Sequence, residues 1–150
     1  RVRPRRRTAA LIAYFDTSAI VPLLVDEGGT IAARDIWLAA DRLVSVRLAR
    51  VEARAALAQA ARTARISAEQ LRSSTQELEG LFVQLDLVDV DDSLIRHAAD
   101  LTEAQALRAY DAVHLAAAMQ VVEADLVLVA GDRALLTAAE SLGLMVATIG

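Results

Sequence analysis

Residues 11–16 read LIAYFD, an apolar run that ends in a carboxylate. Residues 126–132, LVLVAGD, repeat this arrangement near the other end of the chain. Runs that are apolar throughout, rather than alternating, are typical of parallel strands covered by helices on both faces. Ligands of such sheets bind at the carboxyl ends of the strands, which is where Asp16 and Asp132 are expected to lie.

The rest of the chain alternates between strand-like and helix-like segments, which predicts a three-layer α/β/α sandwich with a central parallel sheet. Residues 9–150 are expected to form this single domain, and residues 1–8 a basic, disordered N-terminal extension. The expected strands are 9–15, 43–46, 83–90, 126–130 and 145–149. The expected helices are 17–25, 30–40, 48–64, 67–81, 92–104, 112–122 and 133–142.

Several helix ends carry recognisable signals. Thr30 is expected to cap the helix that follows it. Ser67 with Gln70 forms a capping-box pattern. Gly143 is expected to be the glycine just beyond the end of the helix over 133–142.

The composition narrows the classes of function. With 55% hydrophobic but only 3% aromatic residues, the core must be built from Ala, Leu and Val. The absence of cysteine excludes disulfides and thiolate metal sites, and two histidines do not favour a multi-histidine zinc site. The net charge is −4 and all basic residues are arginine, so the chain is not a generic nucleic-acid coat.

The N-terminus imitates a signal peptide, because arginines precede the apolar run of residues 8–15. Asp16 and Pro22 interrupt that run, and no clear cleavage site follows it. No apolar stretch approaches the roughly 18 residues of a membrane span. We expect a cytoplasmic protein.

Four carboxylates fall at the end of an apolar run or inside one: Asp16, Glu52, Asp111 and Asp132. Taken singly, Asp16, Asp111 and Asp132 are each explained as helix N-caps. His114, three residues after Asp111, reads as a packed core histidine rather than a metal ligand.

Glu52 is the most informative of the four. Its neighbours three and four residues away on the expected helix are apolar, such as Leu48 and Ala56. The arginines project from the other side of the helix, where a solvated glutamate would be expected. Glu52 therefore either faces a cleft or a paired partner, or lies at an edge with its head in water, and the sequence leaves these alternatives open.

Together the acids suggest a cation site. Hard divalent cations take oxygen ligands, and Mg²⁺ commonly binds a few carboxylates together with waters and substrate phosphates. Clustered acids raise one another's pKa, so a bound metal would stabilise the ionised set.

Four blocks of sequence, in this order and spacing, resemble the PIN-domain ribonucleases, most of all the VapC-type toxins of bacterial toxin–antitoxin pairs. They are YFDTSAIVPLL, RVEARAAL, YDAVHLAAA and GDRALLTAAESLGL, and the resemblance covers residues 12–149. It implies a parallel sheet of about five strands and a metal-dependent endoribonuclease that hydrolyses RNA phosphodiester bonds. It also implies a small antitoxin partner and a homodimer.

The same resemblance implies roles for individual residues. Asp16, Glu52, Asp111 and Asp132 would be both the catalytic acids and the ligands of Mg²⁺ or Mn²⁺, and Ser18 would orient the cluster. One position departs from the family, because Ala130 stands where Thr or Ser is common two residues before the fourth acid. That departure keeps a second interpretation open, a catalytically idle PIN-like module that binds RNA or a protein.

Arginines supply candidate RNA contacts. These are Arg47, Arg50, Arg54 and Arg133. The first three are expected on one helical face, where a simple solvated charged face is the alternative. Tyr14 and Trp37 are expected in the core or an interface.

Other acid-bearing α/β families fit less well. A response-regulator receiver needs a site lysine, and this chain has none. A haloacid-dehalogenase-like phosphatase needs a second aspartate where Ser18 stands. No GxGxxG turn or Walker A sequence is present.

Overall fold

The computed structural model describes residues 10–121 and 125–150. Within them, five parallel strands form one sheet in the order β3-β2-β1-β4-β5. The strands are β1 (Ile12–Phe15), β2 (Arg42–Val46), β3 (Asp86–Val88), β4 (Leu126–Ala130) and β5 (Met145–Thr148). The fold predicted from the apolar strands is confirmed, and the expected basic extension lies outside the described residues, as does Ala9.

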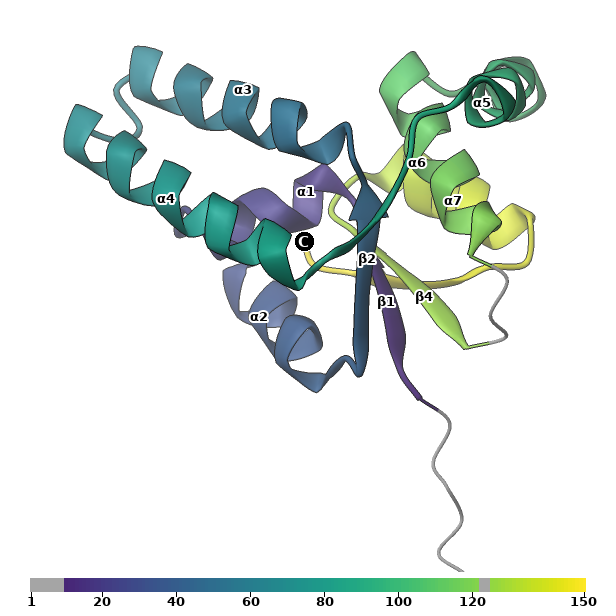
Figure 1. Cartoon of the computed structure of the whole chain (residues 1–150), viewed down its shortest axis with the longest axis horizontal. Coiled ribbons are helices and arrows are strands. Elements are labelled where there is room, and N and C mark those ends of the chain that lie inside the picture. The colour runs from purple at the N-terminus through teal and green to yellow at the C-terminus, as the bar shows by residue number, and fades with distance from the viewer. Residues whose placement is uncertain (1–9, 122–124) are drawn as a thin grey trace, which may run out of the picture.

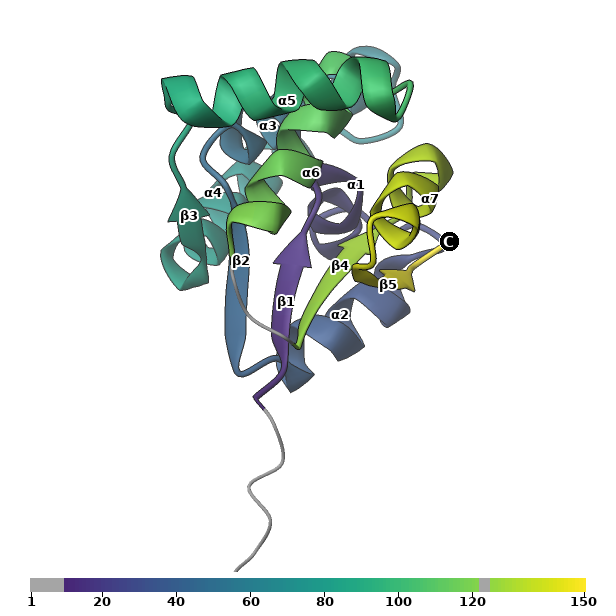
Figure 2. The same cartoon turned by 90° about the vertical axis from the view of Figure 1, so that its right-hand side faces the viewer.

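Helices cover both faces of the sheet, with α1 to α4 on one side and α5 to α7 on the other (Figures 1 and 2). They are α1 (Thr17–Ile20), the 3-10 helix η1 (Val21–Leu23), α2 (Thr30–Ala39), α3 (Ala49–Arg62), α4 (Ala68–Gln84), α5 (Asp92–Ala104), α6 (Ala109–Gln120) and α7 (Arg133–Ser141). None of the described helices is long and apolar enough to cross a membrane.

Burial explains the composition of the strands. All four residues of β1 are buried, and β4 is buried at four of its five positions. The edge strands β3 and β5 contain no buried residue. The apolar runs therefore mark the centre of the sheet, where both faces are covered.

The strand order creates a crevice at the carboxyl ends of β1 and β4. After β1 the chain continues to β2 on one side, whereas β4 lies on the other side of β1 and continues outward to β5. Connections that depart in opposite directions leave a gap at the switch point, and such gaps bind ligands in open α/β sheets.

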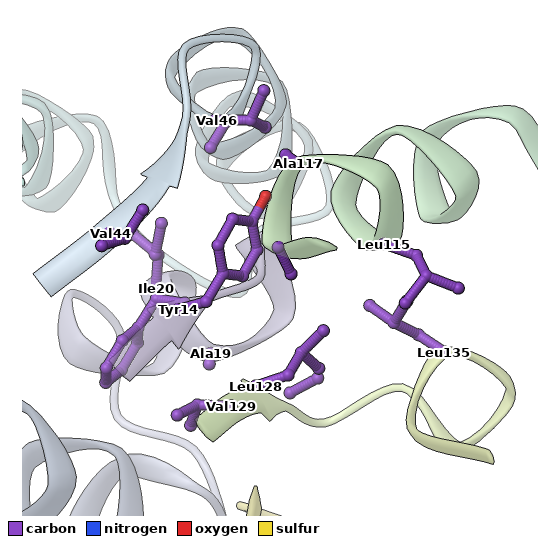
Figure 3. Packing of buried hydrophobic residues seen from close by; sticks show 14 of the residues in the cluster. Tyr14, Ala19, Ile20, Val44, Val46, Leu115, Ala117, Leu128, Val129 and Leu135 are labelled. Carbon is purple, nitrogen blue, oxygen red and sulfur yellow. The ribbon is translucent and has the colours of Figure 1, made fainter. Parts of the chain in front are cut away.

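The core is built largely from small aliphatic side chains (Figure 3). Leu115 of α6 meets Leu135 of α7 over one face of the sheet, and both are fully buried. On the other face, Phe15 and Trp37 contact edge to face, with ring centroids 5.0 Å apart. Tyr14 is also fully buried, so the predicted core placement of Tyr14 and Trp37 is confirmed.

Two predicted helix-end signals are confirmed. Ser67 accepts a hydrogen bond from the Gln70 backbone N–H, while the Gln70 side chain accepts one from the Ser67 N–H. Gly143 follows α7 with a φ of 85°, the left-handed conformation that favours glycine beyond a helix end.

Two predicted caps are wrong. Thr30 lies inside α2, whose N-cap is Gly29, and its hydroxyl instead donates to the Pro22 carbonyl and accepts from the Glu27 N–H. Asp111 is not the cap of α6, because that helix begins earlier and has Arg108 at its N-cap. Asp111 therefore occupies the first helical turn and projects from a fixed backbone.

The expected strand over residues 83–90 is mostly wrong, because α4 continues to Gln84 and β3 spans only Asp86–Val88. Leu78 and Phe82 are both buried against the core, so packing at helical spacing extends the helix into residues of high strand propensity. The single expected helix over 17–25 divides into α1 and η1 before the loop that precedes α2.

The capping box gives a direct test of local stability. Ser67→Ala is expected to lower the free energy of unfolding by about 1 kcal/mol, because the Gln70 N–H loses the hydroxyl that accepts its hydrogen bond. Ser73→Ala, an exposed position inside the same helix, is the control and is expected to be neutral or stabilising by a few tenths of a kcal/mol (~0.3). Chemical denaturation of both variants measures the difference, and equal free energies would contradict the capping role.

Candidate functional site

Four acids from four elements surround the crevice. Asp16 follows β1 and caps α1, Asp132 precedes α7 as its cap, and Glu52 and Asp111 lie in the first turns of α3 and α6. The elements explain this convergence, because β1 and β4 end at the same edge of the sheet and α3, α6 and α7 begin there (Figure 2). Electrostatic coupling links Asp111 to both Asp132 and Asp16.

Asp16 is both a helix cap and a site residue. One carboxylate oxygen, Oδ2, accepts hydrogen bonds from the backbone N–H (3.1 Å) and the hydroxyl (2.5 Å) of Ser18. The other oxygen, Oδ1, lies 3.2 Å from Nε2 of His114. Only 4% of the residue is exposed, so these contacts stabilise a largely desolvated carboxylate.

Asp132 divides its oxygens in the same way. Oδ1 accepts from the Leu135 N–H at 3.0 Å, which caps α7. Oδ2 accepts from Nη2 of Arg108 at 3.1 Å. For both aspartates, capping and a place in the site are therefore compatible.

Glu52 faces partners inside the protein. Its Oε1 accepts from the Thr17 hydroxyl at 3.0 Å and lies 2.7 Å from Nε2 of His114. About a fifth of the side chain, 20%, remains exposed. The edge position with its head in water, which the sequence left open, is therefore wrong, and Glu52 faces a paired partner.

His114 holds Asp16 and Glu52 together. It is 1% exposed, and its two ring nitrogens contact opposite groups: Nε2 faces the two carboxylates and the Thr17 hydroxyl, while Nδ1 lies 2.9 Å from the Tyr14 hydroxyl. Burial lowers the pKa of His114, but the charge of Asp16 and the hydrogen bond to Glu52 outweigh it, so the pKa is raised overall. The expectation of a satisfied core histidine is correct, and the partners that satisfy it are site acids.

Tyr14 completes this part of the network from beneath the crevice. Burial, followed by the charges of Asp16 and Glu52, raises the pKa of Tyr14 well above its usual value. The phenol therefore stays neutral and contacts His114 as a hydrogen-bonding group.

Asp111 and Asp132 form a second pair, bridged by a guanidinium. Nε of Arg108 donates to Asp111 Oδ2 at 3.2 Å, and Nη2 donates to Asp132. Burial raises the pKa of Asp111, the charge of Asp132 raises it further, and Arg108 opposes both. The net effect is a raised pKa, as expected for neighbouring acids that repel one another.

Ser18 connects the ends of β1 and β4. Its hydroxyl donates to Asp16 and accepts from the Gly131 N–H at 2.8 Å, immediately before Asp132. Ala130, which stands where a hydroxyl residue is common in the family that the sequence resembles, is fully buried in β4. The contact from Ser18 to Gly131 orders the backbone beside Asp132 without a hydroxyl at residue 130.

The arginines suggested as RNA contacts pair elsewhere or are exposed. Arg47 lies before α3 rather than on it, so the prediction that it shares a helical face with Arg50 and Arg54 is wrong. Nε of Arg47 instead donates to Asp89 at 2.7 Å. Arg50 pairs with Glu79 at 3.4 Å and lies over the Phe82 ring. Arg54 and Arg133 are exposed.

A cleft of about 580 Å³ opens beside the acids. Thr17, Ser18 and Gly131 line its end nearest the site, and apolar residues such as Val21 line its wall. The ion pair between Arg65 and Glu27, 2.9 Å long, lies among its lining residues. None of the four acids lines this cleft, so it adjoins the acid site through Thr17, Ser18 and Gly131 rather than enclosing it.

The donor chemistry suits a hard divalent cation, because four carboxylates supply oxygen ligands and carry excess negative charge. Among the described residues, however, no three histidine, aspartate or glutamate side chains are arranged to hold one metal ion. The acids instead form two pairs, one joined through His114 and the other through Arg108. The residue types therefore fit a metal site, and Arg108 and His114 balance part of the negative charge of the acids.

Sequence reasoning missed Thr17 and Arg108 as parts of the site and gave Tyr14 and His114 no part in it. Each carries a local signal, because Tyr14 and Thr17 flank the first acid, whereas Arg108 and His114 lie three residues before and after Asp111. Three residues is nearly one helical turn, so Asp111 and His114 share a side of α6. That spacing could have identified His114 as part of the cluster.

Comparisons with known proteins identify the family of the chain. The PIN domain family profile matches residues 13–141. Two relatives from Mycobacterium tuberculosis, Ribonuclease VapC45 and Ribonuclease VapC49, are each 40% identical over 136 residues, covering 91% of this chain and 94% of the relative. The fold also resembles that of DNA-bound VapBC from Salmonella typhimurium, with a TM-score of 0.64, 17% identity, and coverage of 93% and 99% of the two chains.

The profile match and the relatives both extend over most of the chain. The chain belongs to the PIN domain family.

Proposed function

We propose that this protein is a metal-dependent endoribonuclease that hydrolyses RNA phosphodiester bonds, and that it is the toxin of a VapBC-type toxin–antitoxin system. The observation that carries the proposal is the meeting of four carboxylates from separate elements at the switch point of the sheet. The 40% identity to two proteins named ribonucleases supports RNA as the substrate.

Asp16, Glu52, Asp111 and Asp132 would hold Mg²⁺ or Mn²⁺, since both ions favour oxygen ligands. Such an ion would activate a bound water and neutralise charge that develops on the phosphodiester. The protein supplies the fixed positions of the ligands. Asp16 and Asp132 are held by helix caps, and Glu52 is held by Thr17 and His114.

The supporting residues have distinct tasks in this proposal. Ser18 fixes the Asp16 carboxylate and the backbone of Gly131 at once. His114 contacts both Asp16 and Glu52 through Nε2 and so keeps the two carboxylates close together despite their like charge. Tyr14 fixes the ring of His114 from the buried side, where water cannot substitute for it.

The proposed partners follow the same family relationship. We propose a small antitoxin protein that covers the site, a second copy of this chain in a homodimer, and RNA as the substrate in the cytoplasm. The structural relative from Salmonella was solved as a VapBC complex on DNA, which supports an antitoxin partner. The exposed arginines Arg54 and Arg133 are available to contact RNA phosphates, while Arg47 and Arg50 would first leave their acids.

Neutralising single acids tests the assignment. Asp16→Asn and Asp111→Asn are each expected to lower RNA cleavage by more than about 100-fold, since even residues that only hydrogen-bond to a metal ligand are worth ~10–100-fold. Asparagine caps a helix about as well as aspartate, so Asp16→Asn is expected to stay folded. Cleavage of total RNA, read as discrete fragments, is the measurement.

Asp100→Asn, an exposed acid of α5, is the matched control and is expected to cleave RNA like the wild type. Antitoxin must be removed from every preparation first. Undiminished cleavage by both site variants, in preparations free of contaminating nuclease, would contradict the assignment.

Removing the metal gives a second test. EDTA is expected to abolish cleavage, and Mn²⁺ at one hundred times its dissociation constant is expected to stabilise the fold by about 2.7 kcal/mol. Asp111→Asn should lose most of this stabilisation, because one ligand is absent. Thermal unfolding with and without Mn²⁺ measures it, and stabilisation by Mn²⁺ without cleavage of any RNA would favour the idle PIN-like module.

A further inference from the structure

Arg108 lies where local physical chemistry does not favour an arginine. It occupies the N-cap of α6 but makes no side-chain hydrogen bond to the end of the helix. Ser, Thr, Asp or Asn is preferred at this position, because their oxygens accept from the free N–H groups. The end of the helix also carries partial positive charge, which repels a guanidinium.

The two carboxylates explain the conformation of the side chain. Arg108 bridges Asp111 and Asp132, which belong to different helices and have side chains 14% and 23% exposed. The side chain of Arg108 itself is 82% exposed. Its hydrogen bonds to these acids hold the guanidinium in place while most of the side chain lies in solvent.

The bridge stands where a divalent cation would bind. Asp111 and Asp132 belong to the proposed metal ligands, and a cation between them would replace the guanidinium as their counter-charge. The described side chains do not converge on an ion while Arg108 and His114 hold them in two pairs. Of these two basic groups, His114 is buried and held by four partners, whereas Arg108 can move into solvent.

We propose that Arg108 is an internal counter-ion that competes with the divalent cation for Asp111 and Asp132, and that binds an RNA phosphate once the cation displaces it. This inference rests on the proposed function. The planar guanidinium suits both roles, because it forms paired hydrogen bonds with carboxylates and with phosphates alike. The exposed stem lets one side chain reach both at the edge of the crevice.

If Arg108 competes with the cation, removing its charge should strengthen metal binding rather than weaken it. Arg108→Gln is expected to tighten Mn²⁺ binding about three- to tenfold, the range expected when one or two partly exposed ion pairs no longer compete. The same variant is expected to raise the KM for RNA several-fold, about three- to tenfold, because a phosphate contact is lost. Arg108→Lys keeps the charge without the paired donors, so its Mn²⁺ affinity should fall between those of the wild type and Arg108→Gln.

The experiment titrates Mn²⁺ into full-length, antitoxin-free protein, with calorimetry or Mn²⁺ electron paramagnetic resonance as the readout. RNA cleavage is measured at saturating Mn²⁺. Arg96→Gln is the matched control, since Arg96 is an exposed arginine of α5 paired with an aspartate, and it should change neither quantity. Thermal unfolding without metal checks that each variant is folded.

A purely structural role would leave Mn²⁺ binding unchanged or weaken it. Equal or weaker binding by Arg108→Gln would therefore overturn the inference, as would wild-type protein that binds no Mn²⁺. Unchanged KM would overturn the phosphate contact. If the wild type cleaves RNA but Arg108→Gln has unchanged Mn²⁺ affinity, only the role of Arg108 is rejected. If Arg108→Gln binds Mn²⁺ more tightly but the wild type cleaves no RNA, only the proposed nuclease activity is rejected.

Discussion

The desolvated carboxylate of Asp16 at the end of β1 is the constraint on which the site depends. A buried charge is stable only when hydrogen bonds and opposite charges surround it. Ser18 and the first turn of α1 satisfy one oxygen, and His114 faces the other. These contacts bring α6 against β1 and, through Ser18 and Gly131, order the end of β4.

Two acids around the crevice serve both as helix caps and as site residues. Asp16 and Asp132 each use one oxygen to cap a helix and present the other to the site. A cap fixes the carboxylate to within one rotamer, so the fold itself positions the ligands. The N-terminal ends of helices tolerate negative charge, because their free N–H groups and the helix dipole favour it. Placing the acids at helix starts therefore lowers the cost of gathering them.

The sequence predicted the architecture well because the central strands are apolar on both faces, as for β1 and β4. It predicted β3 poorly, because α4 keeps its packing through Phe82 and overrides local strand propensity. The four acids were visible as charges in apolar surroundings. Their partners were not, since Arg108 meets Asp132 only after α6 and α7 have packed, and Thr17 meets Glu52 across 35 residues.

Charge balance connects these observations. Four acids at one edge of a sheet would repel one another. Burial raises the pKa of Asp111, the charge of Asp132 raises it further, and Arg108 offsets only part of the rise. Rigid basic residues between both pairs of acids would remove the repulsion and close the site, whereas none at all would leave the acid charges unbalanced. The chain places a buried histidine between one pair and an exposed arginine between the other. The first fixes geometry and the second can be exchanged, so the fold keeps its acids together while leaving their charge available to a ligand.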